Sequence, residues 1–143
     1  MQRTASAAWS GGLKDGKGSI STQSGVLSDT QYSFGTRFEN GHGTNPEELI
    51  AAAHAGCFTM ALAAQLGTMN FTPQSLRTTA TVTLEKLEAG WTISKIHLDL
   101  KAQIAGISAD AFQSAAASAK ANCPVSRLFK ADITLNASLE QAA

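Results

Sequence analysis

The chain contains two cysteines, Cys57 and Cys123, and a thiol is the side chain best suited to attack an electrophile and to change its oxidation state. Cys57 stands in the segment Ala53-His-Ala-Gly-Cys-Phe-Thr-Met60, within a long apolar stretch. On that context alone, such a cysteine is more often a small core residue than a nucleophile. The residue type therefore suggests thiol chemistry without assigning it.

Cys123 has a more informative environment, the segment Lys120-Ala-Asn-Cys-Pro-Val-Ser126. Asn122 can cap a short helical turn that carries Pro124 in its first turn. Backbone N–H groups and the helix dipole would then lie beside the sulfur and favour its thiolate. We expect Cys123 to ionise more readily than an ordinary cysteine.

His54 precedes Cys57 by three residues and can share its helix face. It could act as a general base, or pack, or form an interface hydrogen bond; packing or a hydrogen bond is the interpretation we favour. A metal site is not expected, because His-x-x-Cys supplies only two ligands and no motif surrounds His42 or His97.

The apolar stretch around Cys57 has the signals of a long helix. In Gly41-His-Gly-Thr-Asn-Pro46, Asn45 suits the N-cap and Pro46 the first helical position. Glu48 stands three residues after the cap and would complete a capping box. No further signal stops the helix before about Thr68, and no Asp, Glu, Lys or Arg stands between Glu48 and Arg77.

A helix over residues 47–68 would be about 33 Å long. A compact chain of this size has a radius of gyration of only about 14 Å. Since the helix is apolar on every side, we expect it to be buried all round, partly by a second copy of the chain. The alternative is a central helix under the curved sheet of one chain. The stretch is largely Ala and contains His54 and Gln65, so we do not expect a membrane span.

The remaining patterns predict an α+β chain that forms a single domain over residues 1–143. Alternating segments predict strands at 17–23 and 32–38, a long hairpin from 76–87 and 91–104, and a closing strand at 131–139. Ser108 can cap a second helix that extends to about Ala121.

Composition excludes several classes of protein. Eleven basic residues balance eleven acidic ones and no basic run occurs, so we expect no nucleic-acid partner. Two cysteines are few for a secreted disulfide scaffold, and the N-terminal residues form no apolar signal segment. We therefore expect a cytoplasmic protein with reduced thiols. No glycine-rich loop for a nicotinamide, flavin or phosphate cofactor is visible, and we expect no cofactor.

Two segments together resemble the OsmC/Ohr family of bacterial peroxide-stress proteins: residues 43–58, from Gly-Thr-Asn-Pro to Gly-Cys-Phe, and residues 122–126, Asn-Cys-Pro-Val-Ser. Residues at the N-terminal end resemble the OsmC branch rather than the Ohr branch, namely Trp9, Gly16-Lys-Gly, Ser24-Gly-Val-Leu and Thr36-Arg-Phe-Glu. The resemblance covers essentially the whole chain. It implies an OsmC-like fold, with curved antiparallel sheets around long central helices, and an intertwined homodimer with two sites at its interface.

The resemblance also implies a thiol-dependent peroxidase that reduces organic hydroperoxides to alcohols in the response to oxidative and osmotic stress. Cys57 matches the peroxidatic cysteine and Cys123 the resolving one, while Arg37 and Glu47 match the charged pair that activates the thiolate. The sulfenic acid would condense to an intramolecular disulfide, which a dithiol, for instance of the lipoyl type, would reduce. The alternative is a non-enzymatic stress protein of the same fold that binds an apolar ligand and has structural cysteines.

Helix geometry constrains this site. Glu47 and Cys57 are ten residues apart, hence about 15 Å apart along one straight helix. If both serve one site, Glu47 must come from the other subunit. Cys57 is also too far from the N-terminus of its helix to gain much from the dipole, so a guanidinium such as Arg37, held by Glu47, is the natural means of lowering its pKa.

The same residues have ordinary structural roles as alternatives. Glu47 suits the first turn of any helix, and an arginine on a strand, as expected for Arg37, is usually a solvated charge. Phe58, Met60 and Leu62 could line a hydroperoxide pocket or simply belong to the core.

Overall fold

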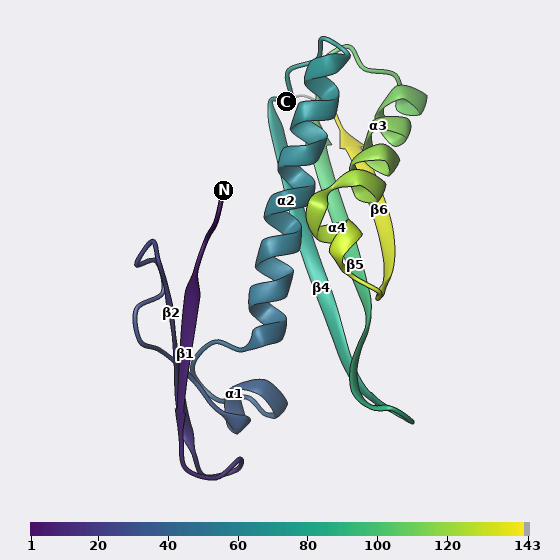
Figure 1. Cartoon of the computed structure of the whole chain (residues 1–143). Helices are drawn as coiled ribbons and strands as arrows, with labels where there is room; N and C mark the ends of the chain where they lie inside the picture. The colour runs from purple at the N-terminus through teal and green to yellow at the C-terminus, as the bar shows by residue number, and fades with distance from the viewer. Residues whose placement is uncertain (142–143) are drawn as a thin grey trace. The chain divides into compact units, whose positions relative to one another are not determined.

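The computed structural model describes residues 1–141 and is α+β, as expected (Figure 1). The chain forms two compact units, one from Met1 to Leu49 and the other from Ile50 onward. The boundary lies near the start of the long helix α2, Pro46–Thr68, so the first turn of this helix belongs to the first unit. The residues that could do chemistry are distributed over both units.

The first unit is built on a three-stranded antiparallel sheet in the order β1-β2-β3. Its strands are β1 (Ala5–Ser10), β2 (Lys17–Thr22) and the short β3 (Thr30–Tyr32). The helix α1 follows at Phe34–Phe38. The strand predicted over 32–38 is therefore wrong beyond Tyr32.

Local capping explains why α1 forms where alternation predicted a strand. The Ser33 hydroxyl accepts a hydrogen bond from the Thr36 backbone N–H at 3.2 Å, and the Thr36 hydroxyl oxygen accepts one from the Ser33 N–H at 2.8 Å. This is a reciprocal capping box with Ser33 at the N-cap. The two bonds close a helical turn, and Arg37 follows in that turn rather than on a strand.

A glycine fixes the connection from α1 to α2. Gly43 has φ of 131°, and a Cβ at this position would collide with the carbonyl oxygen of Gln31. Directly after it, the Thr44 N–H donates to that same carbonyl at 2.9 Å. Only glycine allows this close approach, which ties the start of α2 to strand β3.

The second unit contains a three-stranded sheet in the order β4-β5-β6. Strands β4 (Ser75–Leu87) and β5 (Gly90–Gln103) form the predicted hairpin, and β6 (Asp132–Glu140) matches the predicted closing strand. The pairing of β6 with β5 is parallel, so the expected antiparallel arrangement fails at this pair. The reason is the connection: the chain returns to the sheet through a helical crossover, which delivers a parallel strand.

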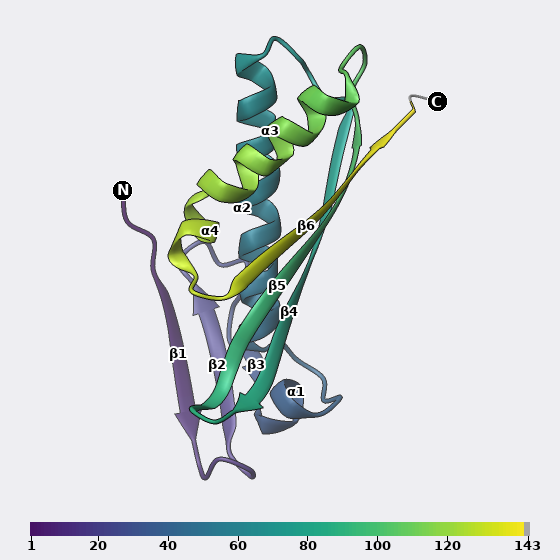
Figure 2. The same cartoon turned by 90° about the vertical axis from the view of Figure 1, so that its right-hand side faces the viewer.

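That crossover consists of α3 (Ala109–Asn122), which begins after the predicted N-cap Ser108, and α4 (Pro124–Leu128). Figure 2 shows α2, α3 and α4 on one face of the β4-β5-β6 sheet. The core lies between these helices and the sheet. Its fully buried large side chains include Phe58 from α2, Leu98 from β5 and Phe112 from α3.

Helix α2 has the predicted bounds but is not covered on all sides by its own chain. Its buried residues recur every four positions: His54, Phe58, Leu62 and Leu66. A second set of small or apolar residues on the helix is exposed: Ala52, Ala53, Gly56, Met60, Ala63, Ala64 and Gly67. We call this set the exposed α2 face. The burial predicted all round the helix thus remains a prediction about the assembled protein.

By length and composition α2 could also cross a membrane, with a mean hydropathy of 1.5 over its most apolar window. Core and interface helices of water-soluble proteins meet the same criterion. The buried row from His54 to Leu66 packs against the sheet of the second unit, as in an ordinary core helix.

Candidate functional site

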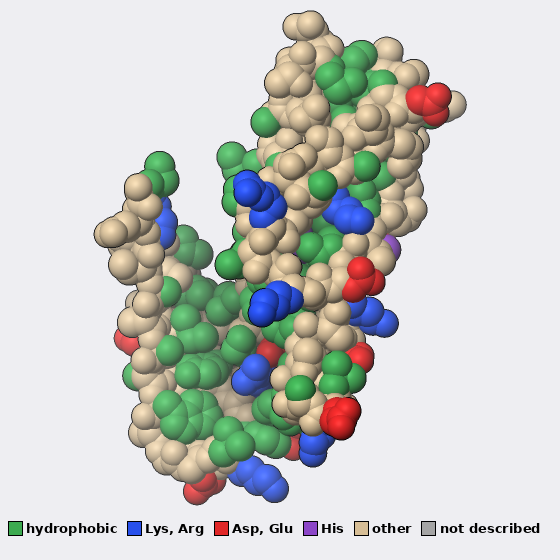
Figure 3. Space-filling view, turned by 45° about the vertical axis from the view of Figure 1, so that its right-hand side comes forward, with side chains coloured by type: hydrophobic (Ala, Val, Ile, Leu, Met, Phe, Trp, Pro, Cys, Tyr) green, Lys and Arg blue, Asp and Glu red, His purple; other side chains and the backbone are tan. Residues whose placement is uncertain are grey.

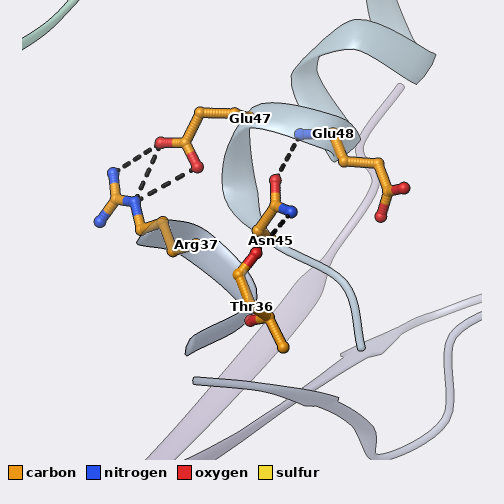
Figure 4. A network of polar contacts seen from close by, with 5 residues as sticks. All are labelled: Thr36, Arg37, Asn45, Glu47 and Glu48. Atoms are coloured by element: carbon orange, nitrogen blue, oxygen red, sulfur yellow. Dashed lines mark hydrogen bonds and ion pairs between the residues drawn. The ribbon is translucent and has the colours of Figure 1, made fainter. Parts of the chain in front are cut away.

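Arg37 and Glu47 form a bidentate ion pair in the first unit (Figure 4). The Arg37 Nη2 and Nε groups donate to Glu47 Oε1 at 2.8 and 3.0 Å, and Nε also reaches Oε2 at 3.3 Å. Arg37 comes from the last turn of α1 and Glu47 from the first turn of α2. The pair fixes the plane of the guanidinium and leaves Nη1 outside these three bonds.

Asn45 holds the two helices that carry this pair. Its side-chain oxygen accepts from the Glu48 N–H at 2.8 Å, which is the predicted N-cap bond of α2. Its amide nitrogen donates to the Thr36 carbonyl in α1 at 3.0 Å. The Glu48 carboxylate accepts from the Thr44 hydroxyl at 2.9 Å rather than serving the predicted capping box. One side chain thus caps α2 and anchors α1 beside it.

An apolar groove of about 290 Å³ lies beside Arg37 in the first unit. Its walls are mostly aromatic or aliphatic: Trp9, Leu13, Tyr32, Ser33, Phe34, Arg37 and Phe38. Figure 3 shows hydrophobic side chains gathered on the visible surface of this unit. Leu13 is 68% exposed, so the groove opens to solvent. A single fixed cation in an apolar groove suits a small amphipathic molecule.

Cys57 and Cys123 lie together in the second unit. Cys57 is partly buried in the middle of α2, and Cys123 is fully buried where α3 ends and α4 begins. The two thiols are close enough for each to shift the pKa of the other, and they are not joined in a disulfide. Two reduced cysteines in contact can form a disulfide when either is oxidised.

The pKa values of the two thiols are shifted in opposite directions. Burial raises the pKa of Cys57, and the neighbouring Cys123 raises it further, against a backbone hydrogen bond from Val125. Burial also opposes ionisation of Cys123, but hydrogen bonds from Ser126 and Cys57 outweigh it and lower the pKa of Cys123. Within one chain, Cys123 is therefore the more readily ionised of the two.

Cys123 owes part of this effect to its place at the N-cap of α4, where its sulfur accepts the Ser126 N–H at 3.3 Å. We predicted Asn122 as the cap, and this is wrong: Asn122 is the last residue of α3, and its amide donates to the Ser118 carbonyl at 3.0 Å. Pro124 does open the short helix as predicted. The thiol itself takes the acceptor role that serine or asparagine has at most N-caps.

His54 is fully buried and bonds to Ser126, with 2.7 Å between Nε2 and Oγ. Its ring also packs edge-on against Phe129, with ring centroids 5.6 Å apart. Burial lowers the pKa of His54. The packing expected for His54 is confirmed, and its hydrogen bond is made within the chain rather than at an interface between subunits.

The predicted site residues thus form two pairs, Arg37 with Glu47 in the first unit and Cys57 with Cys123 in the second. Phe58 and Leu62, considered as pocket residues, belong to the buried core, whereas Met60 is 76% exposed. Among residues 1–141, no group of three or more His, Cys, Asp or Glu is placed to hold a metal ion.

Sequence reasoning missed the part played by Ser126 and the second bond of Asn45. Cys-Pro-x-Ser has the spacing of an N-cap at Cys123 followed by Pro at N1, which could have placed Ser126 at N3 beside the sulfur. No sequence signal predicts that the Asn45 amide reaches back to Thr36, because that contact depends on how the loop folds.

Comparison with known proteins gives a family. The model of the OsmC-like protein family matches residues 39–138, a range that includes both cysteines. The peroxiredoxin OsmC of Escherichia coli strain K12 is 51% identical over 140 residues, which is 98% of each chain.

Solved structures agree in fold. The organic hydroperoxide resistance protein OhrB of Bacillus subtilis has a TM-score of 0.68 at 26% identity, over 96% of this chain and 98% of that one. The organic hydroperoxide resistance protein OsmC of Legionella pneumophila has a TM-score of 0.66 at 26% identity, over 96% of both chains. Since the matches extend through both cysteine segments and nearly the full length of these relatives, the chain belongs to the OsmC family.

Proposed function

We propose that this protein is a thiol-dependent peroxidase that reduces organic hydroperoxides to alcohols. The observation that carries the proposal is the neighbouring pair of free cysteines, Cys57 and Cys123, in a chain of the OsmC family. The relative from Escherichia coli is named a peroxiredoxin, and the solved relatives are named for organic hydroperoxide resistance. In this proposal, residues 1–143 work as one domain.

Cys57 is the peroxidatic residue. Its thiolate attacks the terminal oxygen of the hydroperoxide, the O–O bond breaks, and the alkoxide takes a proton and leaves as the alcohol. Cys57 is then a sulfenic acid. The Cys123 thiolate attacks this sulfur, the S–S bond forms, and hydroxide leaves and is protonated to water. A dithiol, for which the lipoyl type is a candidate, reduces the disulfide by two exchange steps and is itself oxidised to a disulfide.

If Cys57 is to react as a thiolate, a nearby cation must lower its pKa, because within one chain this pKa is raised. Arg37 is the group we assign to this task, with Glu47 fixing its orientation through the bidentate pair. Cys57 stands ten residues after Glu47 on α2, about 15 Å farther along the helix axis. We therefore place Arg37 and Glu47 of one subunit beside Cys57 of the other.

A homodimer also explains the exposed α2 face. The alanine, glycine and methionine side chains of this face form no hydrogen bonds with water, and the small ones let a second helix approach closely. We propose that a second copy of the chain covers it rather than a lipid bilayer. The groove beside Arg37 would then take the organic part of the hydroperoxide against Trp9, Tyr32 and Phe34.

The cytoplasm is the compartment we assign, since the proposed reaction needs a thiol reductant. Stress by peroxides is the condition in which this activity is of use.

The test is consumption of cumene hydroperoxide by the purified protein with dihydrolipoamide as reductant. We expect turnover by the wild type and none above the uncatalysed rate by Cys57→Ser. The matched control Ser118→Ala changes a partly exposed residue of α3 and should keep wild-type activity. Full activity of Cys57→Ser would contradict the assignment, and no activity in the wild type would favour a binding protein without catalysis.

A further inference from the structure

His54 and Ser126 form a buried hydrogen-bonded unit next to Cys123 that the reaction described above does not use. His54 Nε2 lies 2.7 Å from Ser126 Oγ, and the Ser126 backbone N–H donates to Cys123 Sγ at 3.3 Å. His54 is fully buried and Ser126 is 7% exposed. A buried polar network of this kind is costly unless its members are paired, so its presence beside a reacting thiol requires an explanation.

The protonation state of His54 determines which residue donates in its hydrogen bond with Ser126. Burial keeps the imidazole neutral by lowering its pKa. Within residues 1–141, Nδ1 is buried with no hydrogen-bond partner. A buried N–H without an acceptor is rarer in proteins than a buried acceptor without a donor. We therefore assign the proton to Nε2, which leaves Nδ1 as the acceptor without a partner. Nε2–H then donates to the Ser126 oxygen.

A serine hydroxyl that accepts from His54 has its own proton free to donate elsewhere. The Ser126 side chain lies near Cys123, whose sulfur accepts the backbone N–H of the same residue, and this side chain helps to lower the pKa of Cys123. Cys123 Sγ thus accepts the backbone N–H of Ser126, and its pKa is lowered further by the Ser126 side chain, the Cys57 thiol and the Val125 backbone. The titratable groups at this position are Cys57, in contact with Cys123, and His54, which acts through Ser126.

We propose that Ser126 and His54 are positioning residues for disulfide formation and reduction: His54 fixes the Ser126 hydroxyl so that it donates to Cys123 Sγ and stabilises the Cys123 thiolate. This rests on the proposed function, because it assumes that Cys123 attacks an oxidised Cys57. Neither residue touches the hydroperoxide.

The stabilised thiolate serves both half-reactions. In resolution, Cys123 S⁻ attacks the sulfenic sulfur of Cys57, the S–S bond forms, and hydroxide leaves and is protonated to water. In reduction, a thiolate of the dithiol attacks Cys57 Sγ, the S–S bond breaks, and Cys123 departs with the electron pair as a thiolate. A leaving thiol of lower pKa departs faster, so the donors on Cys123 direct the reductant to Cys57.

The first experiment measures ionisation of Cys123 without any hydroperoxide. In a Cys57→Ser background, Cys123 is the only thiol, and its thiolate is followed by ultraviolet absorbance as a function of pH. Adding Ser126→Ala should move the titration to higher pH, because it removes the hydroxyl that stabilises the thiolate. His54→Leu should move it in the same direction, because it removes the group that fixes this hydroxyl. His54→Gln, whose amide can still donate to Ser126, should restore part of the shift. Ser94→Ala is the matched control, since it removes a buried hydroxyl that has no partner in the described residues.

The second experiment follows one turnover with Cys57 present. Loss of the hydroxyl bond leaves about tenfold less Cys123 thiolate at neutral pH, while the remaining thiolate is about threefold more nucleophilic. Ser126→Ala should therefore consume one equivalent of cumene hydroperoxide at the wild-type rate but form the disulfide roughly threefold more slowly. A trapping reagent for sulfenic acid should capture more Cys57 in this variant than in Ser94→Ala.

An unchanged titration in both Ser126→Ala and His54→Leu would overturn the inference even if the enzyme is active. If His54→Leu fails to fold, Ser126→Ala alone decides, because it only replaces one hydroxyl by hydrogen in the short helix α4. A wild-type protein that does not consume the hydroperoxide would instead refute the proposed function, and the titration would still report whether Ser126 and His54 stabilise the thiolate.

Discussion

Cys123 Sγ accepts the Ser126 N–H at 3.3 Å, so that the same cysteine ends α3 and caps α4. The neighbouring Cys57 thiol of α2 also helps to lower the pKa of this sulfur. The pKa of Cys123 is lowered while that of Cys57 is raised. In an isolated chain, Cys123, the proposed resolving cysteine, thus ionises more readily than Cys57. Cys57, the proposed peroxidatic cysteine, needs a further positive charge to lower its pKa.

The substitution Arg37→Met tests whether Arg37 supplies the positive charge that lowers the pKa of Cys57. We expect alkylation of Cys57 to move to higher pH and hydroperoxide reduction near neutral pH to fall by about tenfold or more, because the cation that favours the thiolate is gone. The pH dependence of iodoacetamide labelling at Cys57, read by mass spectrometry, measures the first effect. Arg77→Met, an exposed position on β4, is the control. An unchanged labelling profile in Arg37→Met would remove this residue from the site.

Asn45 variants separate the N-cap from the anchor to α1. Asn45→Asp keeps the acceptor for the Glu48 N–H but loses the donor to the Thr36 carbonyl. We expect it to lose activity while retaining most of its stability, whereas Asn45→Ala should lose activity and about 1 kcal/mol of unfolding free energy. Urea denaturation and hydroperoxide turnover measure the two effects.

Asn136→Ala, which removes an exposed amide on β6, should change neither quantity beyond experimental error. Full activity in Asn45→Asp would mean that the bond to Thr36 does not matter for the orientation of Arg37.

The exposed α2 face predicts the oligomeric state. Ala64→Glu places a charge on this face and should dissociate the dimer and abolish turnover, as measured by analytical ultracentrifugation and the peroxidase assay. Ala117→Glu makes the same change on an exposed position of α3 and should do neither. A wild-type chain that sediments as a monomer at micromolar concentration, yet is active, would contradict the cross-subunit site.

Neutral, buried His54 predicts part of the pH dependence of stability. Its folded pKa lies below the ordinary value of 6.5, so below about pH 6.5 the unfolded chain binds a proton that the folded chain does not. Stability should therefore fall as pH decreases from 6.5 toward the folded pKa. His54→Gln cannot bind this proton and should lose that part of the slope in a series of denaturation measurements at different pH. An identical slope in the two proteins would mean that His54 is not neutral when folded.

Much of this arrangement can be predicted from local sequence signals. Asn45, Pro46 and Ser108 mark helix starts that the structure confirms, and the alternation around Ala89-Gly90 predicts the hairpin. Such signals act over a few residues, through caps and through period-two patterns.

The features that could not be predicted depend on competition between two local signals or on contacts between residues far apart in the chain. The segment after Tyr32 alternates like a strand, but the capping box of Ser33 and Thr36 is stronger and makes a helix. The parallel pairing of β6 follows from the crossover and not from its own sequence. The bond between His54 and Ser126 joins residues far apart in the chain, and no local pattern predicts it. The pairing of Arg37 with Glu47 was expected only from family resemblance.

The central claim is that Cys57 is the residue oxidised by the hydroperoxide and that Cys123 resolves it. The most direct measurement treats Cys123→Ser with one equivalent of cumene hydroperoxide and traps sulfenic acid with dimedone, followed by peptide mass spectrometry. We expect a dimedone adduct at Cys57 in this variant, and a disulfide between Cys57 and Cys123 in the wild type. An intact Cys57 thiol after the hydroperoxide has been consumed would contradict it.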